Sequence, residues 1–161
     1  MAMPFNADEV FEMAEQIERN GAKFYRAAAK KFKSLNKVLL DLASMEAKHE
    51  KIFAGMRAQL SEGEKEPLVF DPDGEAGMYL RVMADGHVFN INMDPQEKLA
   101  GCKTARDLLT TAIGFEKDSI AFYVGLEEAV SPAGGKDKIE AIIREEMGHI
   151  TVLNTRLAVL K

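Results

Sequence analysis

The chain has 161 residues, of which 47% are hydrophobic and 29% are charged, and its formal net charge is −5. This composition excludes a disordered chain, and the negative balance argues against nucleic acid or an anionic membrane as the main partner. No apolar run approaches the roughly 18 residues of a membrane-spanning helix. The N-terminus lacks the basic and then apolar layout of a signal peptide. We therefore expect one domain, residues 1–161, in the cytoplasm.

Two long helices are predicted in the first third of the chain. The first covers about residues 7–33, and Asn6 with Glu9 has the spacing of a capping box at its start. The second covers about residues 35–60. Apolar residues recur at helical spacing in both. Because the joint between them is short, we expect an antiparallel hairpin over residues 7–60.

The next segment, residues 61–94, is rich in acidic residues, glycine and proline. It is predicted to be a long crossover with one short helix over residues 75–84. A strand pair across Asp85 and Gly86 is the alternative, because Val82 and residues 87–91 are compatible with either structure.

Helical signals return after the crossover. Asp94 followed by Pro95 is typical of a helix start. A second capping-box pattern, Thr104 with Asp107, begins a long helix that reaches about residue 130. A break at residues 131–135 separates it from a fourth helix over about residues 136–160. The sequence thus predicts an all-α four-helix bundle, in which hairpins at about 7–60 and 104–160 are joined by the crossover.

Two of the three histidines follow a glutamate by three residues, at matching places in the two hairpins. Glu46 and His49 lie in the stretch MEAKHE, and Glu146 and His149 lie in EEMGHI. Residues i and i+3 lie about 60° apart around a helix and roughly 4.5 Å apart along it. One metal ion can therefore bind a carboxylate and an imidazole from the same helix. The repeated pair favours a dimetal site over a plain helical bundle.

The first and third helices carry a second repeat. IERNGAKFY places Glu18 seven residues before Tyr25, and FEKDSIAFY places Glu116 seven residues before Tyr123. Seven residues make nearly two turns, so each tyrosine shares a face with its glutamate and can hydrogen-bond to a ligand carboxylate. Both glutamates should meet the Glu-x-x-His pairs at the same height in the bundle. The predicted metal ligands are Glu18, Glu46, His49, Glu116, Glu146 and His149.

The charge of such a site requires cations. Several buried carboxylates repel one another and lose hydration, at several kcal/mol each. Two divalent ions balance the four negative charges. Hard oxygen ligands together with neutral imidazole suit iron or manganese better than zinc, which takes fewer and softer ligands.

Three other residues are of types that metal or catalytic sites use. Cys102 is the single cysteine, which excludes an intrachain disulfide and a Cys-x-x-Cys metal site, and we interpret it as a packing residue. His87, in the crossover, is interpreted as a surface or packing residue. Glu145 is the rival of Glu146 as a ligand, but its position breaks the Glu-x-x-His spacing, so we expect it to point away from the site.

These motifs resemble the ferritin-like diiron carboxylate proteins of the rubrerythrin group, over both hairpins. The resemblance implies that Glu46 and Glu146 bridge two iron ions, and that Tyr25 and Tyr123 support the ligands by hydrogen bonds. Manganese or a mixed-metal pair would fit the same ligands.

The resemblance also implies a reaction, the reduction of hydrogen peroxide or O₂ at the carboxylate-bridged di-iron site. Two departures bear on it. Ser119 stands where rubrerythrins often carry an extra glutamate, and the chain lacks the cysteines of a rubredoxin-like domain. A ferroxidase or iron-binding protein without peroxidase turnover is the alternative. Electrons would come from a separate donor protein or from Fe(II), and we expect a homodimer with no nucleic-acid or membrane partner.

Overall fold

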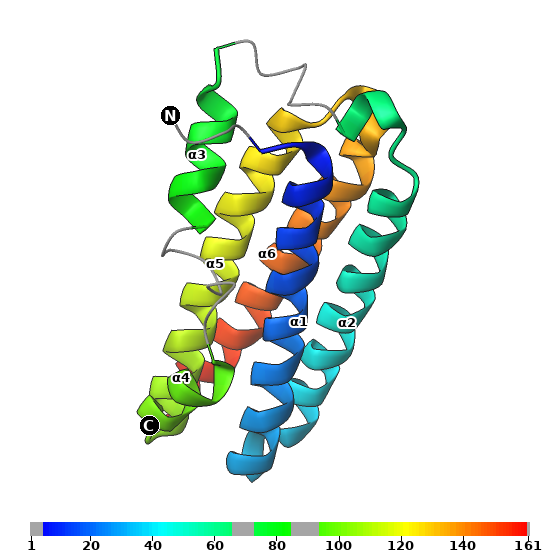
Figure 1. Ribbon diagram of the computed structural model, residues 1–161. Coiled ribbons are helices and arrows are strands. Elements are labelled where there is room, and N and C mark those ends of the chain that lie inside the picture. Colours follow the sequence, from blue (N-terminus) through cyan, green and yellow to red (C-terminus); the bar gives the residue numbers. More distant parts are fainter. Residues whose placement is uncertain (1–4, 66–72, 85–93, 161) are drawn as a thin grey trace.

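The computed structural model describes residues 5–65, 73–84 and 94–160. Within them, four long helices run side by side as two antiparallel hairpins, and each pair of chain neighbours packs together (Figure 1). The predicted all-α bundle is therefore confirmed. The four long helices are α1 (Ala7–Lys31), α2 (Asn36–Ala58), α5 (Ala105–Ala129) and α6 (Lys136–Ala158).

Both predicted capping boxes are present. The backbone N–H of Glu9 donates to Asn6 Oδ1 at 2.8 Å, and the Glu9 carboxylate accepts from the Asn6 N–H at 2.9 Å. Thr104 and Asp107 make the same reciprocal pair at the start of α5, at 2.9 and 3.1 Å. Each cap satisfies backbone donors that a helix start leaves free, and is worth about 1 kcal/mol. The caps fix where the two hairpins begin.

The long helices end one or two residues before the predicted limits, and short 3₁₀ helices form the hairpin joints. Lys33–Leu35 links α1 to α2, and Pro132–Gly134 precedes α6. Gly135, at the end of the second joint, has φ +94°, in the left-handed region that glycine adopts without a steric cost.

Between the two hairpins, the described residues form a 3₁₀ turn and two helices, α3 (Glu75–Ala84) in the crossover and α4 (Pro95–Gly101) after it. The predicted helix over residues 75–84 is confirmed. Val82 is helical, so the alternative strand pair is wrong at that residue. The other partner of that pair, residues 87–91 with His87, lies outside the described residues. Helices α3 and α4 lie at opposite ends of the bundle (Figure 1).

Helix α3 packs against α5 at a glycine. A Cβ added to Gly125 would lie 2.5 Å from Cδ1 of Tyr79, so this close approach requires a residue without a side chain. The Tyr79 hydroxyl donates to the carbonyl of Ala121 at 2.7 Å, and Leu80 is fully buried. The contact joins the crossover to the second hairpin.

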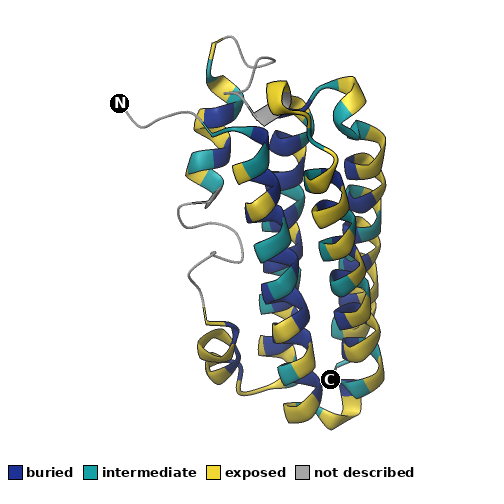
Figure 2. Ribbon diagram, turned by 45° about the vertical axis from the view of Figure 1, so that its right-hand side comes forward, coloured by how far each residue is buried: buried dark blue, intermediate teal, exposed yellow. Residues whose placement is uncertain are grey.

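The core runs along the inner faces of the four long helices (Figure 2). Phe24 meets Phe115 edge to face at a centroid distance of 5.3 Å, and Phe53 lies 5.1 Å from Tyr123. Cys102 is a buried free cysteine, in line with its interpretation as a packing residue. No helix in the described part of the chain is both long enough and apolar enough to cross a membrane.

Candidate metal centre

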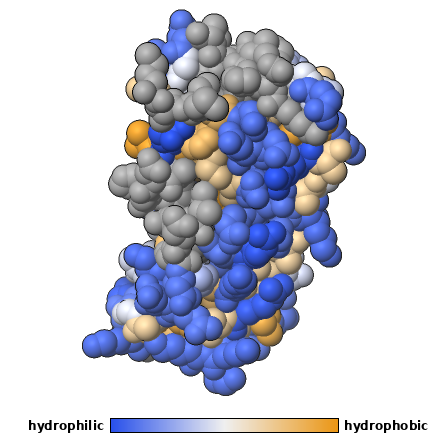
Figure 3. Space-filling model, in the orientation of Figure 1, coloured by the Kyte–Doolittle hydropathy of each residue, from blue (hydrophilic) through white to orange (hydrophobic). Residues whose placement is uncertain are grey.

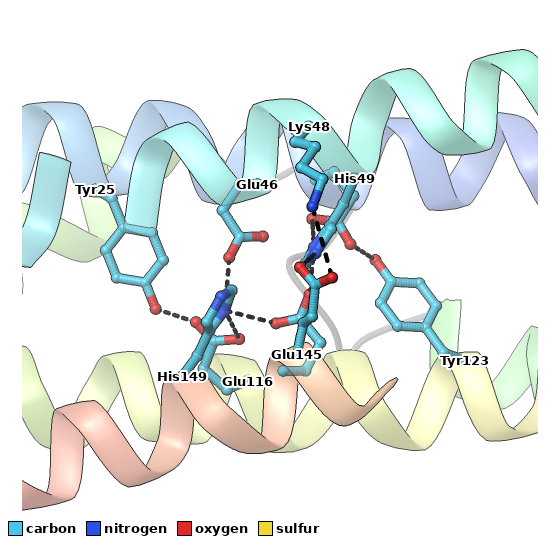
Figure 4. Close-up of polar contacts among 10 residues, drawn as sticks. Tyr25, Glu46, Lys48, His49, Glu116, Tyr123, Glu145 and His149 are labelled. Atoms are coloured by element: carbon cyan, nitrogen blue, oxygen red, sulfur yellow. Dashed lines mark hydrogen bonds and ion pairs between the residues drawn. The ribbon is translucent and has the colours of Figure 1, made fainter. Parts of the chain in front are cut away.

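Six ionisable side chains lie in the middle of this apolar core, and they are the six predicted ligands. None is more than 3% exposed. Helices α1 and α5 each contribute one glutamate, and α2 and α6 each contribute a glutamate and a histidine (Figure 4). The residues that the structure brings together are Glu18, Glu46, His49, Glu116, Glu146 and His149.

The six residues form two overlapping groups. Within each group, one ligand atom from every residue lies within 4.8 Å of the others. Glu46 and Glu146 belong to both groups. Glu18 and His49 complete the first group, and Glu116 and His149 complete the second. A carboxylate shared by two groups is placed as a bridging ligand must be.

Both imidazoles turn Nδ1 toward the carboxylates. His49 Nδ1 lies 2.8 Å from Glu146 Oε1 and 3.5 Å from Glu18 Oε2. His149 Nδ1 lies 3.0 Å from Glu146 Oε2, 3.1 Å from Glu46 Oε1 and 3.5 Å from Glu116 Oε2. The two rings stack at a centroid distance of 5.8 Å. The Glu146 carboxylate therefore lies between the two histidines, with one oxygen facing each.

The six side chains of the cluster lie close together, yet several of their buried nitrogen and oxygen atoms have no hydrogen-bond partner among the described residues. Buried polar atoms are normally hydrogen-bonded, and an unpaired one costs about 1–3 kcal/mol. A single proton serves one acceptor, whereas a cation is bound by several donors at once, so this donor set fits two divalent cations. In the described part of the chain, the buried side-chain atoms without a hydrogen-bond partner all belong to the cluster: Glu18 Oε2, Glu46 Oε1, both oxygens of Glu146, His49 Nδ1, and both ring nitrogens of His149.

The electrostatics of the protein alone show the same need for positive charge. Burial, and then the charge of Glu146, raise the pKa of Glu116 well above its usual range, and burial with Glu146 does the same for Glu46. Burial lowers the pKa of His49, but Glu146 and Glu18 together raise it to about 11. At His149, burial also lowers the pKa, but Glu116 and Glu146 together raise it to about 10. With no metal bound, the cluster holds protons that metal ions would displace.

Each tyrosine supports the glutamate of the opposite hairpin. The Tyr25 hydroxyl donates to Glu116, and the Tyr123 hydroxyl donates to Glu18. Because α1 and α5 run antiparallel, the offset of seven residues brings each tyrosine level with the other helix's glutamate (Figures 1 and 4). Burial and the nearby carboxylates raise the pKa of both phenols, so they remain protonated donors.

The expectation for Glu145 is wrong. Its Oε2 lies 2.9 Å from Nε2 of His49, and its Oε1 lies 3.6 Å from Nζ of Lys48 (Figure 4). The hydrogen bond from His49 lowers the pKa of this carboxyl. Glu145 thereby holds the His49 ring with Nδ1 toward the cluster, as carboxylates commonly do for metal-binding histidines. The contact joins α6 to α2, so spacing within one helix could not indicate it.

Gly21 is a second site residue that sequence reasoning missed. A Cβ at this position would lie 3.1 Å from Glu46 Oε2, so the glycine leaves room for that carboxylate. The matching position in α5 is Ser119, which is 3% exposed. The sequence signal that could have indicated this role is a glycine one turn after a candidate ligand glutamate.

A cleft of about 340 Å³ opens between α2 and α6 and has Glu145 in its wall. Apolar side chains of Ile52, Met56 and Ile142 line it, with Lys51 among the polar residues. Glu145 also contacts His49, so this residue lies between the cleft and the cluster.

Comparisons with known proteins agree with this architecture. The family model described as rubrerythrin matches residues 9–84, which contain Glu18, Glu46 and His49. A solved structure of a ferritin-like diiron-carboxylate protein from Thermotoga maritima shares the fold, with a TM-score of 0.76 and 23% identity over 99% of each chain. No curated protein matches the chain.

The fold is thus a ferritin-like helical bundle that buries a carboxylate and histidine cluster. The rubrerythrin model matches the part of the chain that contains α1, α2 and α3, and the solved structure shares the fold of the whole chain.

Proposed function

We propose that the protein is a rubrerythrin-like, non-haem diiron oxidoreductase that reduces hydrogen peroxide or O₂. The observation that carries the proposal is the pair of overlapping donor groups that share Glu46 and Glu146. Iron is the proposed metal because of the rubrerythrin match and the diiron-carboxylate description of the structural neighbour. Manganese or a mixed pair suits the same oxygen and imidazole donors.

Two ferrous ions, when bound, supply the two electrons of the reaction. Hydrogen peroxide takes two electrons and two protons, its O–O bond breaks, and two waters form. O₂ takes two electrons and two protons to give hydrogen peroxide. The chain's residues hold a nearly neutral site: the carboxylates balance the cations, and Tyr25 and Tyr123 fix the orientation of Glu116 and Glu18. A separate donor protein or incoming Fe(II) then restores the electrons.

A ferroxidase, which oxidises Fe(II) as its substrate, is the second candidate. Ser119 favours it, because this buried residue brings no seventh ligand carboxylate next to Glu116.

The test is an anaerobic Fe(II) titration, followed by stopped-flow oxidation with H₂O₂ and with O₂ in parallel. The proposal expects saturation at two Fe(II) per chain and faster oxidation by peroxide. Faster oxidation by O₂, with uptake far beyond two ions, would select the ferroxidase. Unchanged binding and turnover in a double variant with Glu46→Gln and Glu146→Gln would contradict both. Glu140→Gln, an exposed change on the same helix, is the matched control.

A further inference from the structure

Positive charge is concentrated in one stretch of this acidic chain. The whole chain has 21 basic and 26 acidic residues, yet residues 19–40 contain no aspartate or glutamate. Such segregation creates a local positive field on a protein of negative net charge. The basic residues of the stretch are Arg19, Lys23, Arg26, Lys30, Lys31, Lys33 and Lys37.

Part of this stretch lines a groove of about 690 Å³ between α1 and α4. Lys23, Arg26 and Lys30 follow one another at helical spacing on a single face of α1, and all three are exposed. The facing wall contains Pro95 and Leu99 of α4. In Figure 3 the lower part of this face, over α4 and the end of α1, is largely hydrophilic.

Hydrogen bonds hold the two walls of the groove together, and three of its basic side chains are unpaired among the described residues. Lys31 Nζ donates to the carbonyls of Leu99 at 3.1 Å and Cys102 at 2.7 Å, which ties α4 to α1. Lys23, Arg26 and Lys30 make no ion pair within the described ranges. Asp94 is the acidic residue among those that line the groove. Among the described residues these three cations have no acidic partner, so they can pair with negative charge on another molecule.

The groove lies close to the candidate metal centre. Tyr25 stands between Lys23 and Arg26 in sequence, but its ring points inward and its hydroxyl donates to Glu116. The same turns of α1 therefore face the groove on one side and the cluster on the other. A helix with its side chains is about 10–12 Å across, so a redox group docked in the groove would lie one helix away from the centre.

We propose that this groove is the docking surface for a small acidic protein that delivers electrons to the centre. The proposal rests on the proposed function, which requires an external electron source. The free cations span two helical turns, about 10 Å, which matches several carboxylates on a protein surface better than one small anion. Docking between opposite charges raises the association rate and weakens as salt screens it.

The binding test uses metal-free protein and oxidised rubredoxin, a small acidic one-electron carrier, as the probe. The groove variant combines Lys23→Glu with Lys30→Glu. The control combines Lys136→Glu with Arg156→Glu on α6 and makes the same change in net charge. We expect wild type and control to bind rubredoxin with salt-dependent affinity, and the groove variant to bind at least tenfold more weakly. Equal binding by the groove variant and the control, or no binding by wild type, would overturn the proposal.

Two further experiments distinguish the possible reasons for a negative result. Inorganic phosphate titrated into wild type tests for a small-anion site, and binding of phosphate without binding of rubredoxin would overturn the docking proposal. Diferric protein is then reduced, by two equivalents of reduced rubredoxin or by dithionite. We expect the groove variant to lose at least tenfold in rate with rubredoxin and to match wild type with dithionite.

If protein reduced by dithionite is not oxidised by peroxide or O₂, the proposed function fails and the role in electron delivery fails with it. If that oxidation proceeds and rubredoxin reduces the groove variant as fast as the control, only the docking site is wrong.

Discussion

The two hairpins contribute the same ligand types to the centre but surround them differently. Each provides one glutamate, one Glu-x-x-His pair and one tyrosine that crosses to the other hairpin. His49 has Glu145 on its second ring nitrogen, whereas Nε2 of His149 has no hydrogen-bond partner among the described residues. Met45 occupies the position in α2 that Glu145 occupies in α6. The repeat supplies the six candidate ligands, and the residues around them make the two donor groups unequal.

The outer surfaces of the hairpins differ as well. The second hairpin is covered at one end by α3, through the close contact at Gly125. The first hairpin presents the basic groove beside α4 at the other end. The cluster is therefore nearly symmetric inside, whereas α3 and the basic groove lie on particular sides of the bundle.

The largest expected effect distinguishes a shared ligand from an unshared one. Glu146→Gln removes a carboxylate that belongs to both groups, so binding of both metal ions should weaken by at least 100-fold. Glu18→Gln should weaken only the ion held with His49. Anaerobic Co(II) titration, followed by absorbance, measures both steps, with Glu140→Gln as the control. Equal loss of both ions in the Glu18 variant would contradict the assignment of bridging and terminal ligands.

The second prediction concerns pH and the protein without metal. The raised pKa values of His49 and His149 contribute stability that is complete below pH 6.5 and is lost as pH rises toward 10–11. The raised pKa values of Glu46 and Glu116 act in the same direction. Above pH 6.5 the free energy of unfolding should therefore fall by up to about 1.4 kcal/mol per pH unit for each histidine.

Urea unfolding at pH 6.5 and pH 9, with and without Co(II), measures this loss. Metal loading should flatten the pH dependence, because cations then replace the protons. A metal-free protein that is more stable at pH 9 than at pH 6.5 would contradict the proton-filled cluster.

The third prediction tests the inequality of the two histidines directly. Glu145→Ala removes the partner of His49 and should weaken metal binding in that group by 10- to 100-fold, while the other group changes little. Met45→Glu should supply a partner for His149 and tighten the second group. Metal titrations of the two variants, with Glu140→Ala as the control, give both numbers. An equal effect of the Glu145 change on both ions would show that the contact does not act through His49.

The smallest expected effect comes from the space beside Glu46. Gly21→Ala should shift that carboxylate by a few tenths of an ångström and weaken metal binding several-fold. The unfolding free energy should change by less than about 1 kcal/mol, since alanine favours the helix. Ser119→Ala, at the matching position in α5, should change metal binding less. Metal titration and urea unfolding of the two variants measure these effects. Unchanged metal affinity in the Gly21 variant would show that the Glu46 carboxylate does not need the space that the glycine leaves.

Local sequence signals were sufficient for the helices and for the residues that meet at the centre. Capping boxes at Asn6 and Thr104 and the short helix over residues 75–84 depend on neighbours in sequence, and the structure has all of them. The Glu-x-x-His pairs share a helix face for the same reason. Their role as metal ligands stays a prediction, as do the single-domain boundaries and the homodimer.

Relations between helices could not be read from spacing. Glu145 reaches His49 across the bundle, and Tyr25 bonds to Glu116 rather than to a glutamate of its own helix. Both contacts depend on the axial offset between packed helices, which is set by side-chain packing along the whole interface. Gly21 depends on the distance between α1 and α2 in the same way.

The most direct test of the account is anomalous diffraction at the iron edge from crystals loaded with Fe(II) under anaerobic conditions. We expect two iron peaks roughly 3.5–4 Å apart, one in each donor group, with Glu46 and Glu146 in contact with both. A single peak, or peaks outside the cluster, would contradict a bridged dimetal centre.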